Sequence, residues 1–83
     1  MSTTDDLPPI PAYAPAPGRY RHYKGNEYEV LNTARHSEHT DQFVVVYRPM
    51  RDPDAIWVRP LEMFVEEIDG PDGRVRRFAP IAS

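Results

Sequence analysis

The side chains best suited to chemistry lie in one polar stretch, residues 36–41. His36, Ser37 and Glu38 are the residue types of a hydrolytic triad. A triad needs its nucleophile, base and orienting group in one line, whereas neighbours on a strand or tight turn point in different directions. We therefore predict no catalytic residue in this stretch.

The same stretch contains candidate metal ligands. His36, His39 and Asp41 offer nitrogen and oxygen atoms from one loop, and His22 could join them across a sheet. No helix fixes their spacing, and polar loop side chains more commonly bond nearby backbone. We predict no metal site, with His22, His36 and His39 as the weak candidates for one. A metal-dependent enzyme built on these histidines is the alternative.

Other catalytic patterns are missing from the sequence. The four glycines fall at expected turns or strand ends, so there is no glycine-rich loop to hold a phosphate. The chain has no cysteine, which excludes disulfides, thiolate zinc sites and cysteine nucleophiles. Glu66 and Glu67 face opposite ways on a strand and do not form the carboxylate pair of a glycosidase. We expect a protein that is not an enzyme and has no cofactor.

Aromatic and arginine residues interleave on the expected strands, a pattern typical of binding surfaces. Small β barrels use such surfaces to bind peptides or stack bases, with arginine pairing with a carboxylate or phosphate. The predicted ligand-binding residues are Tyr20, Tyr23, Tyr47, Arg48, Trp57 and Arg59. We expect a non-enzymatic binding or adaptor module that recognises a peptide or an acidic partner. Binding of single-stranded nucleic acid or a nucleotide on the same face is the alternative.

The charge of the chain bears on that choice. A net charge of -3 and a pI near 5.5 argue against bulk electrostatic attraction to nucleic acid or anionic lipid. Lys24 is the only lysine, and the other nine basic residues are arginines. The planar fork of arginine favours specific ion pairing, although a GC-rich coding sequence explains the same bias.

The aromatic residues also have a structural explanation, because small barrels need them to fill the interior. If Ile56 and Val58 point inward, alternation places Trp57 and Arg59 outward together. Trp57 is nevertheless also a candidate for the core. The other aromatic residues expected in the core are Tyr28, Phe43, Phe64 and Phe78.

The arginines have a structural explanation of their own. Arginines that pair with acidic residues on neighbouring strands fix the strand register and recognise nothing outside the chain. The arginines concerned are Arg35, Arg48 and Arg59, and the acidic candidates are Glu27, Glu29 and Glu62. The sequence leaves both roles open.

Turn-forming residues divide the chain into short strands. We expect strands at residues 18–23, 27–35, 42–48, 56–59, 65–68 and 74–78. Pro60 starts a single helical turn, residues 60–64, with Leu61 and Phe64 on one side.

Two of these strands carry patterns that predict burial. In the second, Tyr28, Val30 and Ala34 share one parity and Thr33 the other, so we expect the first three on one buried face. The third strand is apolar at both parities, which indicates a central strand covered on both sides.

Five or six short antiparallel strands with one helical turn predict an all-β, SH3-like, partly open barrel. An OB-like barrel is the competitor, but it needs longer strands and a longer helix. We expect a single domain at residues 18–81. A disordered leader at residues 1–17 precedes it and holds five of the ten prolines.

Three separated strings in the chain resemble domain-of-unknown-function family 1653. They are YRHYKGNEY at residues 20–28, ARHSE at residues 34–38 and WVRPLEMF at residues 57–64. The resemblance implies a small bacterial β domain with an SH3-like barrel. It implies no activity and supplies no catalytic residues. The loop at residues 51–54 departs from the glycine-containing turn expected there.

The sequence also bears on compartment and assembly. No stretch approaches the length of a transmembrane helix, and residues 1–6 lack the features of a signal peptide. A chain without cysteine suits a reducing compartment, so we expect a cytoplasmic protein with no membrane partner. Residues 42–48 could pair edge to edge with a second copy. We expect a monomer or a weak homodimer with an unidentified protein or peptide partner.

Overall fold

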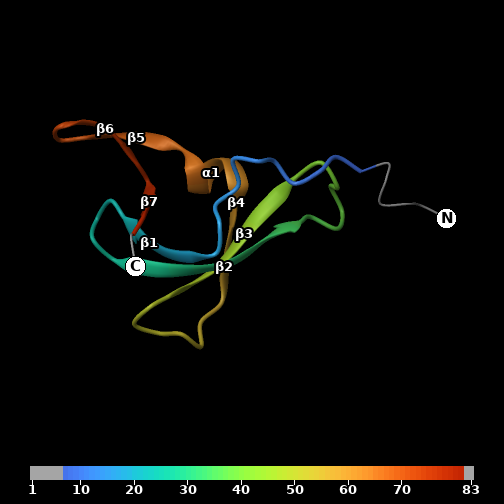
Figure 1. The fold of residues 1–83 in the computed structure, drawn as a ribbon, viewed down its shortest axis with the longest axis horizontal. Coiled ribbons are helices and arrows are strands. Elements are labelled where there is room, and N and C mark those ends of the chain that lie inside the picture. The colour runs from blue at the N-terminus through green and yellow to red at the C-terminus, as the bar shows by residue number, and fades with distance from the viewer. Residues whose placement is uncertain (1–6, 82–83) are drawn as a thin grey trace.

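Seven strands and one helical turn follow one another in the computed structural model, which describes residues 7–81 (Figure 1). In chain order they are β1 (Gly18–His22), β2 (Glu27–Arg35), β3 (Phe43–Pro49), β4 (Trp57–Pro60), α1 (Leu61–Val65), β5 (Glu67–Gly70), β6 (Gly73–Arg76) and β7 (Phe78–Pro80). The all-β class and the single helical turn are confirmed. There is one strand more than expected, because residues 74–78 divide at Arg77 into β6 and β7.

Five strands form one antiparallel sheet in the order β4-β3-β2-β1-β7, and β5 pairs with β6 in a separate hairpin. Figure 1 shows this hairpin projecting from one side of the domain. Within residues 7–81, β4 and β7 do not pair with each other, so the barrel is partly open as predicted. β3 lies between β2 and β4 and has no free edge for the pairing with a second copy considered for residues 42–48.

The turn between β1 and β2 depends on a glycine. Gly25 has a φ of +107°, a conformation that favours a residue without a Cβ. Its N–H donates to the carbonyl of His22 at 2.7 Å, and the N–H of His22 donates to Asn26 at 2.8 Å. This tight turn holds the end of β1 in place.

A bulge in β2 changes which side chains are buried. The pairing with β3 shifts between Val30 and Asn32, which leaves one extra residue on β2. Thr33 therefore lies opposite Val45 and is buried, while Ala34 lies on the other face. The expectation that Ala34 shares a face with Tyr28 and Val30 is wrong, because strict alternation fails across a bulge.

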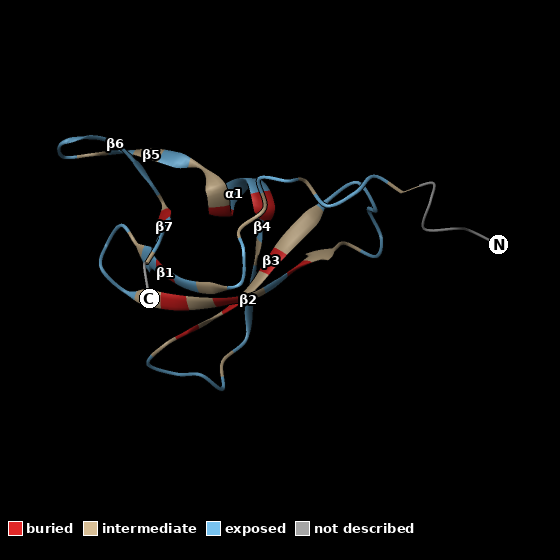
Figure 2. Ribbon diagram, in the orientation of Figure 1, coloured by how far each residue is buried: buried red, intermediate tan, exposed pale blue. Residues whose placement is uncertain are grey.

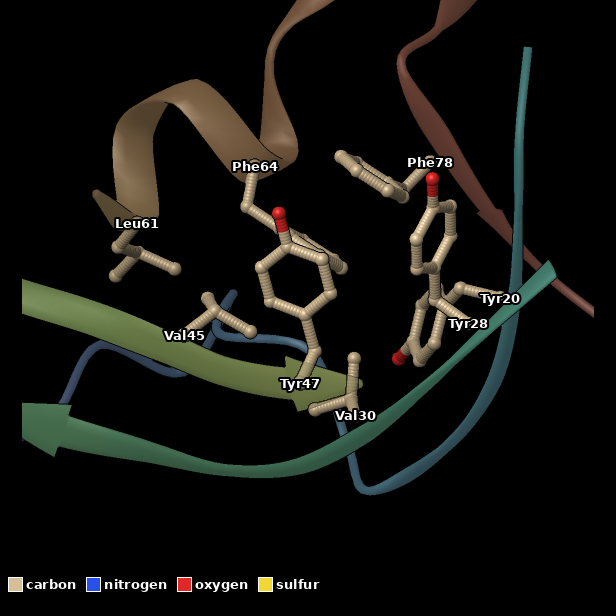
Figure 3. Packing of buried hydrophobic residues seen from close by; sticks show 8 residues of the cluster. All are labelled: Tyr20, Tyr28, Val30, Val45, Tyr47, Leu61, Phe64 and Phe78. Carbon is tan, nitrogen blue, oxygen red and sulfur yellow. The ribbon is translucent and has the colours of Figure 1, made fainter. Parts of the chain in front are cut away.

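The core lies between the sheet and α1 (Figure 2). Its buried residues are Tyr20, Tyr28, Val30, Val45, Tyr47, Leu61, Phe64 and Phe78. Figure 3 shows side chains from β2 and β3 pointing toward Leu61 and Phe64 of α1. The rings of Phe64 and Phe78 are stacked with centroids 4.1 Å apart. Phe43 is only partly buried and packs at the margin of this core.

We call the face of the sheet that carries these core residues the inner face. On β4, Trp57 lies opposite Tyr47 and Arg59 lies opposite Val45, so both side chains are on the inner face. Val58 and Ile56 are 62% and 53% exposed. The condition considered for this strand, with Ile56 and Val58 inward, is therefore not met, because the register with β3 aligns Trp57 and Arg59 with buried residues.

Residues 7–17, the described part of the predicted leader, have contacts with the domain. Ala14 packs against the core, and the Tyr20 hydroxyl donates to the carbonyl of Ala16 at 2.9 Å. The Tyr13 hydroxyl donates to Glu62 of α1 at 2.5 Å. Residues 1–6 of the leader lie outside the described residues.

We predict that Phe64→Ala lowers the free energy of unfolding by about 3–5 kcal/mol, because it opens a cavity against Phe78. Urea denaturation followed by circular dichroism measures this loss. Met63 on the same helical turn is 45% exposed, so Met63→Ala serves as the control and changes stability by no more than about 0.5 kcal/mol. Equal losses in the two variants would contradict this packing.

Candidate peptide-binding surface

The open side of the barrel is lined by aromatic side chains from both ends of the sheet. Trp57 on β4 packs against Tyr28 and Tyr47, with ring centroids 6.1 and 6.0 Å apart. On the other side, His22 packs against Phe78 of β7 at 4.9 Å and against Tyr23 at 4.5 Å. Tyr28 joins the two sides, because its ring lies 6.4 Å from that of His22.

We name this surface the mouth and define it by His22, Tyr23, Trp57 and Arg59. Tyr23 and Trp57 are 44% and 42% exposed. The buried rings of Tyr28, Tyr47 and Phe78 form its floor. Exposed aromatic rings over a packed aromatic floor can bind a partner without reorganisation of the fold.

Arg59 spans the gap between the two open edges. Its Nε donates to the Tyr47 hydroxyl at 3.3 Å, and its guanidinium carbon lies 5.4 Å from the centroid of the Phe78 ring. Both contacts orient the guanidinium. In residues 7–81, the end nitrogens Nη1 and Nη2 of Arg59 make no hydrogen bond or ion pair. They are positioned donors for an oxyanion.

Positive charge gathers at the mouth. Burial lowers the pKa of His22 below its ordinary value of 6.5, and the cations of Arg77, Arg59 and Lys24 lower it further, in that order. The backbone N–H of Lys24 also donates to His22 Nδ1 at 3.2 Å, which fits a neutral ring. Burial disfavours a charge of either sign, so only the three nearby cations favour a bound anion here.

Arg77 fixes the hairpin beside the mouth. Its guanidinium forms an ion pair with Glu66 at 2.5 Å, and its backbone N–H donates to the Glu66 carbonyl at 3.0 Å. The carbonyl of Arg77 accepts the N–H of Tyr23 at 2.9 Å. Arg77 therefore joins β5, β7 and the end of β1.

The structure separates the six residues that the sequence grouped into one ligand-binding face. Trp57 and Arg59 both contact Tyr47 at the mouth, and Tyr23 joins the mouth through its contact with the His22 ring. Tyr20 and Tyr47 are buried in the core and are not part of an exposed face. Arg48 lies on the outer face and pairs with Glu29 at 2.7 Å, as the structural explanation for the arginines proposes.

Within residues 7–81, the other two arginines, Arg35 and Arg59, do not bridge strands through carboxylates. Arg35 donates to the Thr40 carbonyl at 2.7 Å and lies over the ring of Phe43. Arg59 has the aromatic partners described above. His22 is a mouth residue that the sequence indicated only as a weak candidate for a metal ligand. Alternation along β1 could have indicated this position, because His22 has the same parity as the buried Tyr20 and therefore lies on the inner face.

In the polar stretch at residues 36–41, the His36 ring bonds to nearby backbone. Nδ1 of His36 accepts the backbone N–H groups of Glu38 and His39, both at 3.1 Å. His22 ends β1 beside the start of β2, whereas His36 follows the end of β2, so His22 does not join His36 and His39 in the described structure. Among residues 7–81, no group of three or more histidine and acidic side chains could hold a metal ion.

The model of the family of proteins of unknown function DUF1653 matches residues 18–80. The chain belongs to the DUF1653 family. The crystal structure of a DUF1653 protein from Bordetella bronchiseptica is similar, with 40% identity and a TM-score of 0.69. The match covers 80% of this chain and 86% of that one. No curated protein matches the chain.

The DUF1653 match contains every residue of the mouth. The family carries no assigned activity. In the described part of this DUF1653 chain, no helix has the length and apolar character needed to cross a membrane.

We predict that Arg48 and Glu29 stabilise the sheet by only about 0.3–1 kcal/mol, because both side chains are about a third exposed and solvent screens the pair. A double-mutant cycle with Arg48→Ala and Glu29→Ala measures the coupling. The more exposed pair of Arg21 and Glu27 is the control and gives a smaller coupling. No coupling between Arg48 and Glu29 would contradict a structural role for this pair.

We predict that His22 makes the stability depend on pH. The pKa of His22 in the folded protein lies below the value of 6.5 in the unfolded chain. At a pH between these two values, the unfolded state therefore binds more protons than the folded state. The contribution is complete above pH 6.5 and is lost as the pH falls from 6.5 toward the lower pKa. His22→Gln should flatten this part of the profile of unfolding free energy against pH. An NMR titration midpoint for His22 above 6.5 would refute the prediction.

Proposed function

We propose that this DUF1653 chain is a non-enzymatic binding module of the bacterial cytoplasm that takes an acidic peptide segment at the mouth. The observation that carries the proposal is Arg59, whose guanidinium is oriented by Tyr47 and Phe78 while its end nitrogens point to no partner in residues 7–81. A carboxylate would accept two parallel hydrogen bonds from these nitrogens. The exposed ring of Trp57 would pack against a neighbouring apolar side chain.

Several contacts support a binding role over catalysis. Three of the polar groups with catalytic potential already have partners: Glu66 pairs with Arg77, Glu62 accepts from Tyr13, and His36 accepts from backbone. The bacterial source of the similar DUF1653 structure and the lack of cysteine support the proposed compartment.

Single-stranded nucleic acid is the second ligand class that an aromatic and arginine surface could take. The net charge of -3 opposes it. The peptide is favoured because the mouth has one oriented guanidinium, whereas nucleic acid requires a row of cations along its phosphates.

Trp57 is the only tryptophan, so its fluorescence reports directly on the mouth. The test titrates the chain with an amidated hexapeptide of two glutamates, two leucines and two serines, and with the matched glutamine peptide. We predict binding of the glutamate peptide alone. Arg59→Gln should weaken the affinity for this peptide about tenfold, because it removes a charge-assisted hydrogen bond. Ile56→Ala on the outer face is the control and should leave the affinity unchanged.

Equal binding of the glutamate and glutamine peptides would refute the proposal. So would preferential binding of an oligothymidylate with a steep salt dependence, which would assign the mouth to nucleic acid. Circular dichroism of each variant checks that the fold is retained.

A further inference from the structure

A second site lies beside the mouth, under the projecting hairpin. A cavity of about 490 Å³ opens between the end of β1, the hairpin and β7. This volume is typical of sites that hold a small ligand or one or two side chains. Its lining residues are Arg21, His22, Tyr23, Pro71, Asp72, Val75, Arg76 and Ala79.

The cavity combines an apolar wall with two cations. Pro71, Val75 and Ala79 form the aliphatic part, and Val75 is 37% exposed although it is a large apolar residue. Arg76 makes no ion pair in residues 7–81. Arg21 donates to Glu27 at 3.0 Å through Nη2, which orients its guanidinium.

The charges of the lining fit one particular anion. Two arginines and one aspartate, Asp72, line the cavity. Arg21 is already paired with Glu27 outside the lining, so Arg76 is the lining arginine left without an ion pair in residues 7–81. A carboxylate brings one negative charge, whereas a phosphate monoester brings between about 1.5 and 2 at neutral pH. The wall is aliphatic apart from Tyr23 and His22 and suits a leucine-like side chain better than a stacked base.

We propose that this cavity binds a carboxylate attached to an apolar group, with Arg76 and Arg21 holding the carboxylate and Val75, Pro71 and Ala79 packing against the apolar part. Such a group occurs at the C-terminal apolar residue of a peptide and where an acidic residue precedes an apolar one. The inference rests on the proposed function in taking a peptide as the ligand. It uses arginines other than Arg59, so the two sites can be tested apart.

The test records amide NMR spectra of the labelled full chain with three acetylated tripeptides. Gly-Leu-Leu with a free carboxylate carries the charge at its terminus, Glu-Leu-Leu amide carries it on a side chain, and Gly-Leu-Leu amide carries none. We predict that at least one of the charged peptides shifts the amides of Val75, Arg76 and Ala79, and which one does so identifies the source of the carboxylate. The uncharged peptide leaves them in place.

Arg76→Gln should weaken binding about tenfold, since it removes charge-assisted hydrogen bonds to the carboxylate. Arg74 on the same strand is exposed, contacts Asp69 and does not line the cavity. Arg74→Gln is therefore the matched control and should leave the affinity unchanged.

Three results would overturn the inference: equal binding of the uncharged tripeptide, no shift with any tripeptide, or larger shifts with inorganic phosphate than with either carboxylate. Loss of tripeptide binding in Arg59→Gln but not in Arg76→Gln would also overturn it. That last result would place the ligand at the mouth and leave the proposed function intact.

Discussion

The structure depends on how the two open edges of the sheet are held together without backbone hydrogen bonds. β4 and β7 end the sheet and do not pair with each other. Side chains join them instead: Arg59 of β4 lies over Phe78 of β7, and Phe78 stacks on Phe64 of α1. Because side chains instead of backbone hydrogen bonds span this open side, aromatic rings and a guanidinium lie at the surface. The side-chain contacts that join β4 to β7 thus also form the mouth.

Much of this fold could be predicted from the sequence, because turn residues and alternation are local signals. The second strand was predicted with the observed bounds of β2, and Pro60 marked the start of α1. The bulge in β2 could not be predicted, since it depends on pairing with β3. The orientation of β4 could not be predicted for a related reason: apolar residues occur at both parities of residues 56–58, and only the register with β3 decides which side chains lie on the inner face.

The candidate site was predicted in part. The interleaved aromatic and arginine residues indicated Tyr23, Trp57 and Arg59 as surface residues of the mouth. The pattern does not show how far each side chain is buried. Tyr20 and Tyr47 belong to the same pattern and fill the core, because Phe64 of α1 packs against both rings. The cavity beside the hairpin left no sequence signal, since residues far apart in the chain line it.

The most direct test of this account is a double-mutant cycle between Arg59→Gln and Phe78→Leu, with the free energy of unfolding as the readout. If the guanidinium joins the open edges through the Phe78 ring, the two substitutions are coupled by about 0.5–1 kcal/mol. Additive effects of the two substitutions would contradict the account, because they would show that Arg59 does not hold the edges of the barrel together.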